Sequence, residues 1–256
     1  MTATSRKVVS ADGTTISCLV SGRGRPLVIM PGTLTVPEMY LPLVESLATR
    51  YTVTLVNRRG YGASERGPEP SSVARQAQDL VAVLAGEIEP AVVFGHSFGG
   101  LIALSATREL PHRVARLVLY EPPLALLGTE LVPLLDACRT DVAQGRPDDA
   151  VRRAFAVSGS PDVREDTVPA RVVARLSASV AGLLADLECA TGLAAPVPEW
   201  ARISAPVALV RGARSTEPYV RSVELLRAMF PAAPYTILPG QAHFPDDLTL
   251  VDAVLG

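Results

Sequence analysis

The segment Gly95-His96-Ser97-Phe98-Gly99-Gly100 constrains the fold of this chain more than any other. It follows a short apolar run at 91–95, typical of a buried strand, and opens a helical pattern that extends to residue 110. A glycine-rich turn could contain such a serine by chance. With a strand before it and a helix after it, the segment predicts a turn so sharp that only small residues fit two positions before and after Ser97.

Short apolar runs alternate with helical patterns over most of the chain, after a hairpin at Asp12-Gly13. This alternation predicts an α/β fold, with a mostly parallel, doubly wound sheet covered by helices on both faces. The predicted strands are 7–10, 15–20, 27–30, 52–56, 91–95, 114–120, 206–211 and 235–238. The predicted helices are 37–49, 72–85 with Ser72 as its cap, 98–110, 218–230 and a terminal helix after Pro245.

The alternation stops between residues 122 and 200. This stretch contains helical patterns at 130–144, 148–155 and 170–189 and no credible strand. We therefore expect a sheet domain in two pieces, 1–121 and 201–256, with a helical insertion at 122–200. The apolar residues of the insertion should pack it onto the sheet domain, and some should face a pocket. They are Leu124, Leu126, Leu127, Leu131, Leu134, Leu135, Phe155, Leu176, Leu183, Leu184 and Leu187.

Composition narrows the class of protein. Apolar residues make up 48% of the chain, which is enough for a substantial core. The net charge is -2, and lysines and arginines form no basic stripe, so we do not expect the protein to bind nucleic acid. Three widely spaced cysteines favour neither a zinc site nor a disulfide framework. No apolar stretch reaches the roughly 18 residues of a membrane span, and the first ten residues predict no signal peptide. We expect a cytoplasmic monomer or homodimer that binds a small molecule and uses no cofactor or metal.

Ser97 is a candidate nucleophile because its hydroxyl would stand at the carboxyl edge of the sheet, where open α/β folds bind ligands. The N–H of Phe98 begins the next helix and can donate a hydrogen bond to a developing oxyanion. A serine needs a base to accept its proton, and the chain has three histidines. His96 should point away from Ser97, and His112 should lie at the opposite edge of the sheet. His243, on the loop after the last predicted strand, remains as the base.

Together these segments resemble the α/β-hydrolase family. Pro31-Gly32-Thr33 stands where the family has its His-Gly-x oxyanion loop, and the segment 57–64 stands where it often has D-x-R-G-x-G-x-S. Proline at 31 and asparagine at 57 depart from that pattern at positions that shape loops more than chemistry. The resemblance implies that the Thr33 N–H joins the Phe98 N–H in an oxyanion hole, with Leu34 as second choice. It also implies that the insertion forms a lid over Ser97.

The acid that orients His243 is less simply assigned. In most of the family it follows the strand after the insertion in a G-x-x-D segment, but here that segment ends in Ser215. Glu217 and Glu121 are the substitutes. Leu119-Tyr120-Glu121-Pro122 resembles family members, including certain haloalkane dehalogenases, whose acid ends the strand before the insertion. We prefer Glu121, because tyrosine and prolines restrict its backbone, whereas Glu217 begins a helix whose dipole already favours its charge.

The resemblance implies a serine hydrolase, esterase-like, in which Ser97 attacks an ester or related carbonyl of a small, mainly apolar molecule. The same residues could instead serve a lyase of small-molecule biosynthesis, through elimination or carbon–carbon cleavage. A ligand receptor without catalysis is the third alternative, against which intact Ser97 and His243 argue. Serine at 97 argues against dehalogenase and epoxide-hydrolase chemistry, which need a carboxylate there, and against a cysteine mechanism.

Overall fold

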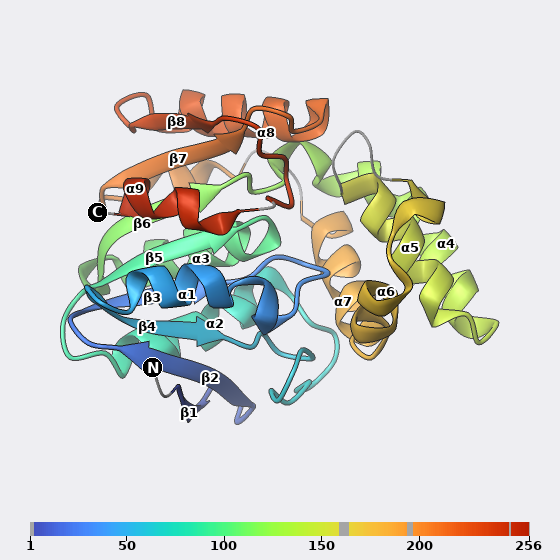
Figure 1. The fold of residues 1–256 in the computed structure, drawn as a ribbon, viewed down its shortest axis with the longest axis horizontal. Helices are drawn as coiled ribbons and strands as arrows, with labels where there is room; N and C mark the ends of the chain where they lie inside the picture. The colour runs from blue at the N-terminus through green and yellow to red at the C-terminus, as the bar shows by residue number, and fades with distance from the viewer. Residues whose placement is uncertain (1–2, 159–163, 194–196, 246, 256) are drawn as a thin grey trace.

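The protein, described here from a computed structural model covering residues 3–158, 164–193, 197–245 and 247–255, is built on an eight-stranded sheet. The strand order is β1-β2-β4-β3-β5-β6-β7-β8 (Figure 1). β2 pairs antiparallel with both of its neighbours, β1 and β4. The remaining strands in this order, β4-β3-β5-β6-β7-β8, are parallel to one another. The predicted fold class is confirmed. The strands are β1 (Thr4–Val9), β2 (Thr15–Gly22), β3 (Arg25–Met30), β4 (Tyr51–Val56), β5 (Ala91–His96), β6 (Val114–Tyr120), β7 (Val207–Gly212) and β8 (Tyr235–Leu238).

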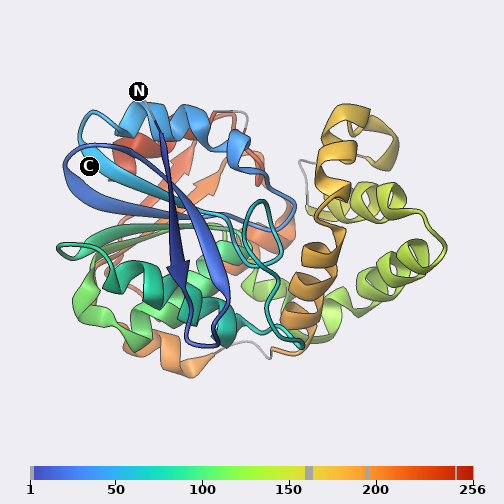
Figure 2. The same cartoon turned by 90° about the horizontal axis from the view of Figure 1, so that it is seen from below.

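Both faces of the sheet are covered by helices, which explains why the central strands are continuous apolar runs. Along β3, Leu27 and Ile29 pack into one apolar cluster, whereas Val28 and Met30 pack into the other. The α-helices of the sheet domain pack on both of these faces (Figure 2). They are α1 (Leu41–Leu47) and α9 (Asp252–Leu255) on the first face, and α2 (Val73–Ala85), α3 (Phe98–Glu109) and α8 (Glu217–Met229) on the second.

The predicted cap of α2 is confirmed: the Ser72 hydroxyl accepts a hydrogen bond from the Arg75 N–H at 3.1 Å. The helix expected at 37–49 is shorter, because a 3-10 turn (Pro37–Met39) precedes α1. The terminal helix after Pro245 likewise consists of a 3-10 turn (Leu248–Val251) followed by α9. None of the helices within the described ranges is long and apolar enough to cross a membrane.

Among its described residues, the segment between β6 and β7 contains helices and no strand, and its α-helices lie beyond the carboxyl ends of the parallel strands (Figures 1 and 2). The prediction of a single helix at 170–189 was wrong. The chain turns at 178–179 and forms two helices there. The second of these is docked on the sheet domain, where Gly182 lies against Tyr61 and leaves no room for a side chain. The α-helices of the insertion are α4 (Val132–Ala143), α5 (Pro147–Ser158), α6 (Ala170–Ser177) and α7 (Val180–Thr191).

Backbone meets backbone where α3 begins. A Cβ on Gly99 would lie 2.1 Å from the carbonyl oxygen of Met30 and 2.4 Å from that of Pro31. A Cβ on Gly95 would lie 2.7 Å from the Cα of Gly100. Gly95 is therefore required by the close approach of β5 to α3. Gly99 is required by the close approach of α3 to the end of β3, which brings Ser97 beside the loop that follows β3.

We predict that Gly99→Ala lowers the free energy of unfolding by about 3 kcal/mol, since the added methyl overlaps backbone that cannot move without shifting β3. Gly86→Ala, at the end of α2, should change it by less than about 1 kcal/mol, because that Cβ meets its nearest atom at 3.5 Å. Urea unfolding followed by circular dichroism measures both. Equal losses in the two variants would contradict the packing argument.

Candidate active site

Ser97 occupies the sharp turn between β5 and α3. Its φ angle of 52° lies in the left-handed region, which residues with a Cβ rarely adopt. Two backbone hydrogen bonds hold the turn, from the Ser97 N–H to the Tyr120 carbonyl and from the Gly100 N–H to the Ser97 carbonyl, both at 2.8 Å. The serine side chain is thereby fixed at the carboxyl edge of the sheet and is 7% exposed.

Ser97, His243 and Glu121 form a continuous row of hydrogen bonds. The Ser97 Oγ lies 2.9 Å from Nε2 of His243, and Nδ1 of the same ring lies 2.8 Å from Oε2 of Glu121. Because a carboxylate only accepts, Nδ1 carries the proton and Nε2 is left to accept from the serine hydroxyl. The structure thus brings together the three residues that the sequence singled out, with the histidine tautomer that a general base requires.

Glu121 is fully buried, and both carboxylate oxygens have partners. Its Oε2 faces His243, while Oε1 accepts from the Gly212 N–H at 2.7 Å and from the Ser215 hydroxyl at 2.5 Å. The alternative acid, Glu217, is exposed at the first residue of α8 and makes no hydrogen bond to His243 within the described part of the chain. The geometry therefore favours Glu121 as the residue that orients the histidine.

His96 connects the loop after β3 with the backbone of His243. The Gly32 N–H donates to the Tyr40 hydroxyl at 3.1 Å, and that hydroxyl lies 2.7 Å from Nδ1 of His96. Since Nε2 of His96 lies 2.8 Å from the carbonyl oxygen of His243, Nε2 must donate and Nδ1 must accept. Burial lowers the pKa of His96 to about 3, so the ring is neutral. His112, in contrast, precedes β6 at the opposite edge of the sheet.

Two residues near the row carried no local signal in the sequence. The ring of Tyr219, near the start of α8, stacks on the His243 ring with centroids 3.5 Å apart and planes 13° apart. Asp186, from α7, accepts a hydrogen bond from the Thr33 hydroxyl at 2.7 Å. Their roles depend on how α7 and α8 are docked, which neither spacing nor residue type reveals.

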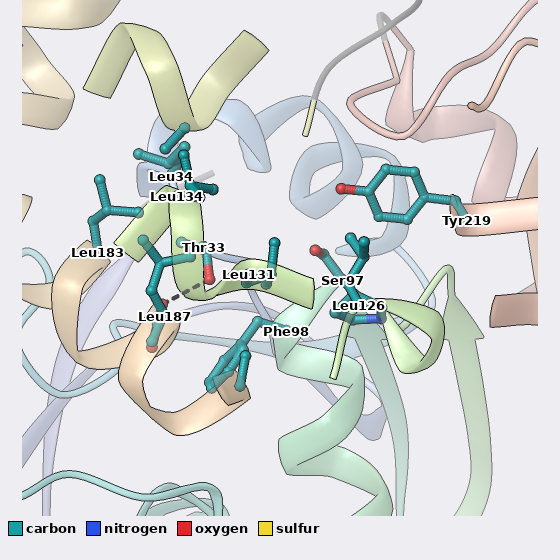
Figure 3. Close-up of a pocket in the computed structure, with 14 residues that line it drawn as sticks. Thr33, Leu34, Ser97, Phe98, Leu126, Leu131, Leu134, Leu183, Leu187 and Tyr219 are labelled. Atoms are coloured by element: carbon teal, nitrogen blue, oxygen red, sulfur yellow. Dashed lines mark hydrogen bonds between the residues drawn. The ribbon is translucent and has the colours of Figure 1, made fainter. Parts of the chain in front are cut away.

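A pocket opens above Ser97 between the sheet domain and the insertion (Figure 3). In this view Tyr219 lies on one side of Ser97, and Leu183 and Leu187 lie on the other. The empty space between its lining residues is about 470 Å³, open solvent at the mouth included. Leucines 124, 127, 135, 176 and 184 and Phe155 do not line it. The lining residues are Thr33, Leu34, Ser97, Phe98, Pro123, Leu126, Leu131, Leu134, Ala154, Leu183, Asp186, Leu187, Ala190 and Tyr219.

The loop after β3 lies directly against the serine, since a Cβ on Gly32 would be 2.9 Å from the Cβ of Ser97. Thr33 and Leu34 both line the pocket, and Leu34 has a φ angle of 56°. The N–H of Phe98 is the first of α3 and has no partner within the helix. An oxyanion hole formed by Phe98 with Thr33, or with Leu34 as second choice, stays a prediction.

Comparison with known proteins identifies the family. The profile described as "Alpha/beta hydrolase family" matches residues 27–249. A crystal structure of an alpha/beta hydrolase from Sphaerobacter thermophilus is 30% identical, superimposes with a TM-score of 0.83, and covers 98% of this chain and 99% of that one.

Two curated relatives are named as a hydrolase and an esterase. A 2-(acetamidomethylene)succinate hydrolase from Mesorhizobium japonicum is 24% identical over 92% of this chain and 87% of its own length. A pimeloyl-[acyl-carrier protein] methyl ester esterase from Xylella fastidiosa is 34% identical over a segment that spans 41% of this chain and 39% of the esterase.

We predict that Glu121→Gln slows the reaction of Ser97 with an activated ester by roughly 10³- to 10⁴-fold without unfolding the protein, since an amide facing Nδ1 favours the wrong histidine tautomer. Glu217→Gln should slow it by less than about tenfold. Steady-state kcat for the two variants, with circular dichroism as a check of folding, makes the comparison. The reverse ranking would assign the acid to Glu217.

His96 should make the protein less stable in acid. The pKa of His96 is about 3 in the folded protein, against an ordinary value of about 6.5 in the unfolded chain. Between these values only the unfolded chain binds the proton, so the contribution of His96 to the free energy of unfolding falls by about 1.4 kcal/mol per pH unit as the pH decreases. NMR should find this imidazole uncharged at pH 4.5. A His96 ring that titrates near pH 6 would refute the assignment.

Proposed function

We propose, because the chain belongs to the alpha/beta hydrolase family, that it is a serine hydrolase that cleaves an ester or related carbonyl compound through an acyl-enzyme. The observation that carries this proposal is the unbroken row of hydrogen bonds from Ser97 through His243 to Glu121. His243 and Glu121 are fully buried, so water does not compete for these contacts. The hydrolase and esterase names of the relatives agree with this reaction class.

In the first half-reaction, the Ser97 Oγ attacks the carbonyl carbon while Nε2 of His243 accepts the hydroxyl proton. Glu121 holds the ring and stabilises the imidazolium, and the Phe98 N–H together with the Thr33 or Leu34 N–H stabilises the oxyanion. The imidazolium then protonates the departing alcohol. In the second half-reaction, His243 takes a proton from water while the water oxygen attacks the acyl carbon. The imidazolium then returns this proton to the Ser97 Oγ as its bond to the acyl carbon breaks, which releases the carboxylic acid and restores the free serine.

The pocket lining supports a small, mainly apolar and uncharged acyl group. Ten of its fourteen residues are leucine, alanine, proline or phenylalanine, and none of the described residues that line it is cationic. One curated relative is named for a succinate derivative. Carboxylates of such a substrate would need a cation in the pocket lining, so we do not extend that substrate to this chain. Because helices of the insertion supply much of the lining, we propose that the insertion acts as the lid.

We predict that a fluorophosphonate probe adds one label to the wild-type protein and none to Ser97→Ala, since only the activated hydroxyl displaces fluoride. Mass spectrometry of the intact protein measures the label. His243→Ala should slow labelling by several orders of magnitude, whereas His112→Ala, at the opposite edge of the sheet, should leave it unchanged.

Short p-nitrophenyl esters should also give a burst of nitrophenol equal to the enzyme concentration. Labelling of Ser97→Ala to the wild-type level would end the serine-nucleophile proposal. Labelling at Ser97 without hydrolysis of any ester would favour the lyase alternative, and the absence of both would favour a non-catalytic receptor.

A further inference from the structure

Asp186 is the one acidic residue among the described residues that line the pocket. Its side chain is 2% exposed, and its carboxylate accepts five hydrogen bonds. Oδ1 accepts from Arg58 Nη1 at 2.8 Å and from Gln76 Nε2 at 3.1 Å. Oδ2 accepts from Arg58 Nη2 at 2.6 Å and from the hydroxyls of Tyr61 and Thr33, each at 2.7 Å. With so many donors in place, this carboxylate has little capacity left to bind a substrate.

Arg58 is the cation behind the pocket wall. Its side chain is 2% exposed, and the guanidinium carbon lies 5.2 Å from the ring centroid of Phe98, which faces the pocket. Arginine keeps its charge at any ordinary pH, so this site holds a permanent positive charge in a poorly solvated wall. The bidentate pair with Asp186 neutralises it.

The two charges come from different parts of the chain. Arg58 follows β4 in the sheet domain, whereas Asp186 belongs to α7 of the insertion. Docking of α7 therefore adds apolar lining, through Leu183 and Leu187, and removes the positive charge from the wall in the same step. A pocket with the arginine but without the aspartate would attract an anionic acyl group.

We propose that Asp186 determines specificity: by neutralising Arg58 it makes the pocket select uncharged acyl groups over acyl groups that end in a carboxylate. This inference rests on the proposed hydrolase function of Ser97 and names the substrate class of that site. Asp186 acts through Arg58, not on the reacting atoms, so its removal should change relative substrate binding more than the chemical step.

The test uses two p-nitrophenyl esters of equal shape, made from 5-methylhexanoic acid and from glutaric acid through one of its carboxyl groups. The first ends in an isopropyl group and the second in a carboxylate. Wild-type protein should show kcat/KM at least tenfold higher for the neutral ester, after correction for spontaneous hydrolysis. Asp186→Asn, which keeps the shape and exposes the charge of Arg58, should shift this ratio at least tenfold toward the glutarate ester, mainly through KM.

Asp141 provides a matched control. It is also a buried aspartate of the insertion, 4% exposed, and it accepts hydrogen bonds from Arg146 and Arg153, but it does not line the pocket. Asp141→Asn should leave the ratio of the two esters at the wild-type value. The double variant Asp186→Asn/Arg58→Gln should lose the gain for the glutarate ester, because the unmasked cation has been removed.

An unchanged ratio in folded Asp186→Asn would overturn the inference, as would a shift of equal size in Asp141→Asn. If Asp186→Asn does not fold, the wild-type ratio decides: equal hydrolysis of the two esters refutes selection against anions. If the wild type hydrolyses neither ester, this result contradicts the proposed hydrolase function and not the proposed selectivity. The selectivity is then measured from the rates at which a neutral and a carboxylate-bearing fluorophosphonate label Ser97, with the same tenfold criterion.

Discussion

The first turn of α3 packs against the end of β3 with no side chain between the two backbones, and the candidate site is built around this contact. Gly99 lies against the carbonyl groups of Met30 and Pro31, which brings the loop after β3 next to Ser97. Within the described residues, the non-glycine positions with positive φ are Leu34, Ser97 and Glu121, all at this edge of the sheet. Each costs on the order of 1–2 kcal/mol, so the surrounding packing must hold them in place.

Two buried polar networks stabilise this arrangement from opposite sides. One runs from Gly32 through Tyr40 and His96 to the backbone of His243, and it is uncharged. The other pairs Arg58 with Asp186. A buried ion pair contributes little net stability, because desolvation of the charges offsets their attraction, but loss of one partner is costly. The pair is therefore better explained by what it specifies: the position of α7 on the sheet domain and the neutrality of the pocket wall.

Much of the sheet could be predicted from sequence, because strands buried on both faces are short apolar runs and the glycines around Ser97 mark an unusually close approach. The fold class and the family are confirmed. The break between α6 and α7 could not be predicted, since it depends on where α7 meets Tyr61. Tyr219 and Asp186 were missed for the same reason: each reaches the site only through the docking of a helix. The roles of Ser97, His243 and Glu121 were inferred from the turn motif, from elimination among the histidines and from the family resemblance, and they stay predictions.

The position of the candidate acid, Glu121, shows how one departure from the family pattern is accompanied by another. Glu121 directly follows β6, the strand between β5 and β7, so its carboxylate lies between the turn at Ser97 and the loop after β7. The residue at the family's usual acid position, Ser215, donates its hydroxyl to Oε1 of Glu121. An aspartate at 215 would put a second carboxylate, which only accepts hydrogen bonds, where Oε1 of Glu121 now has a donor. The hydroxyl at 215 therefore fits a carboxylate at 121 whose other oxygen faces His243.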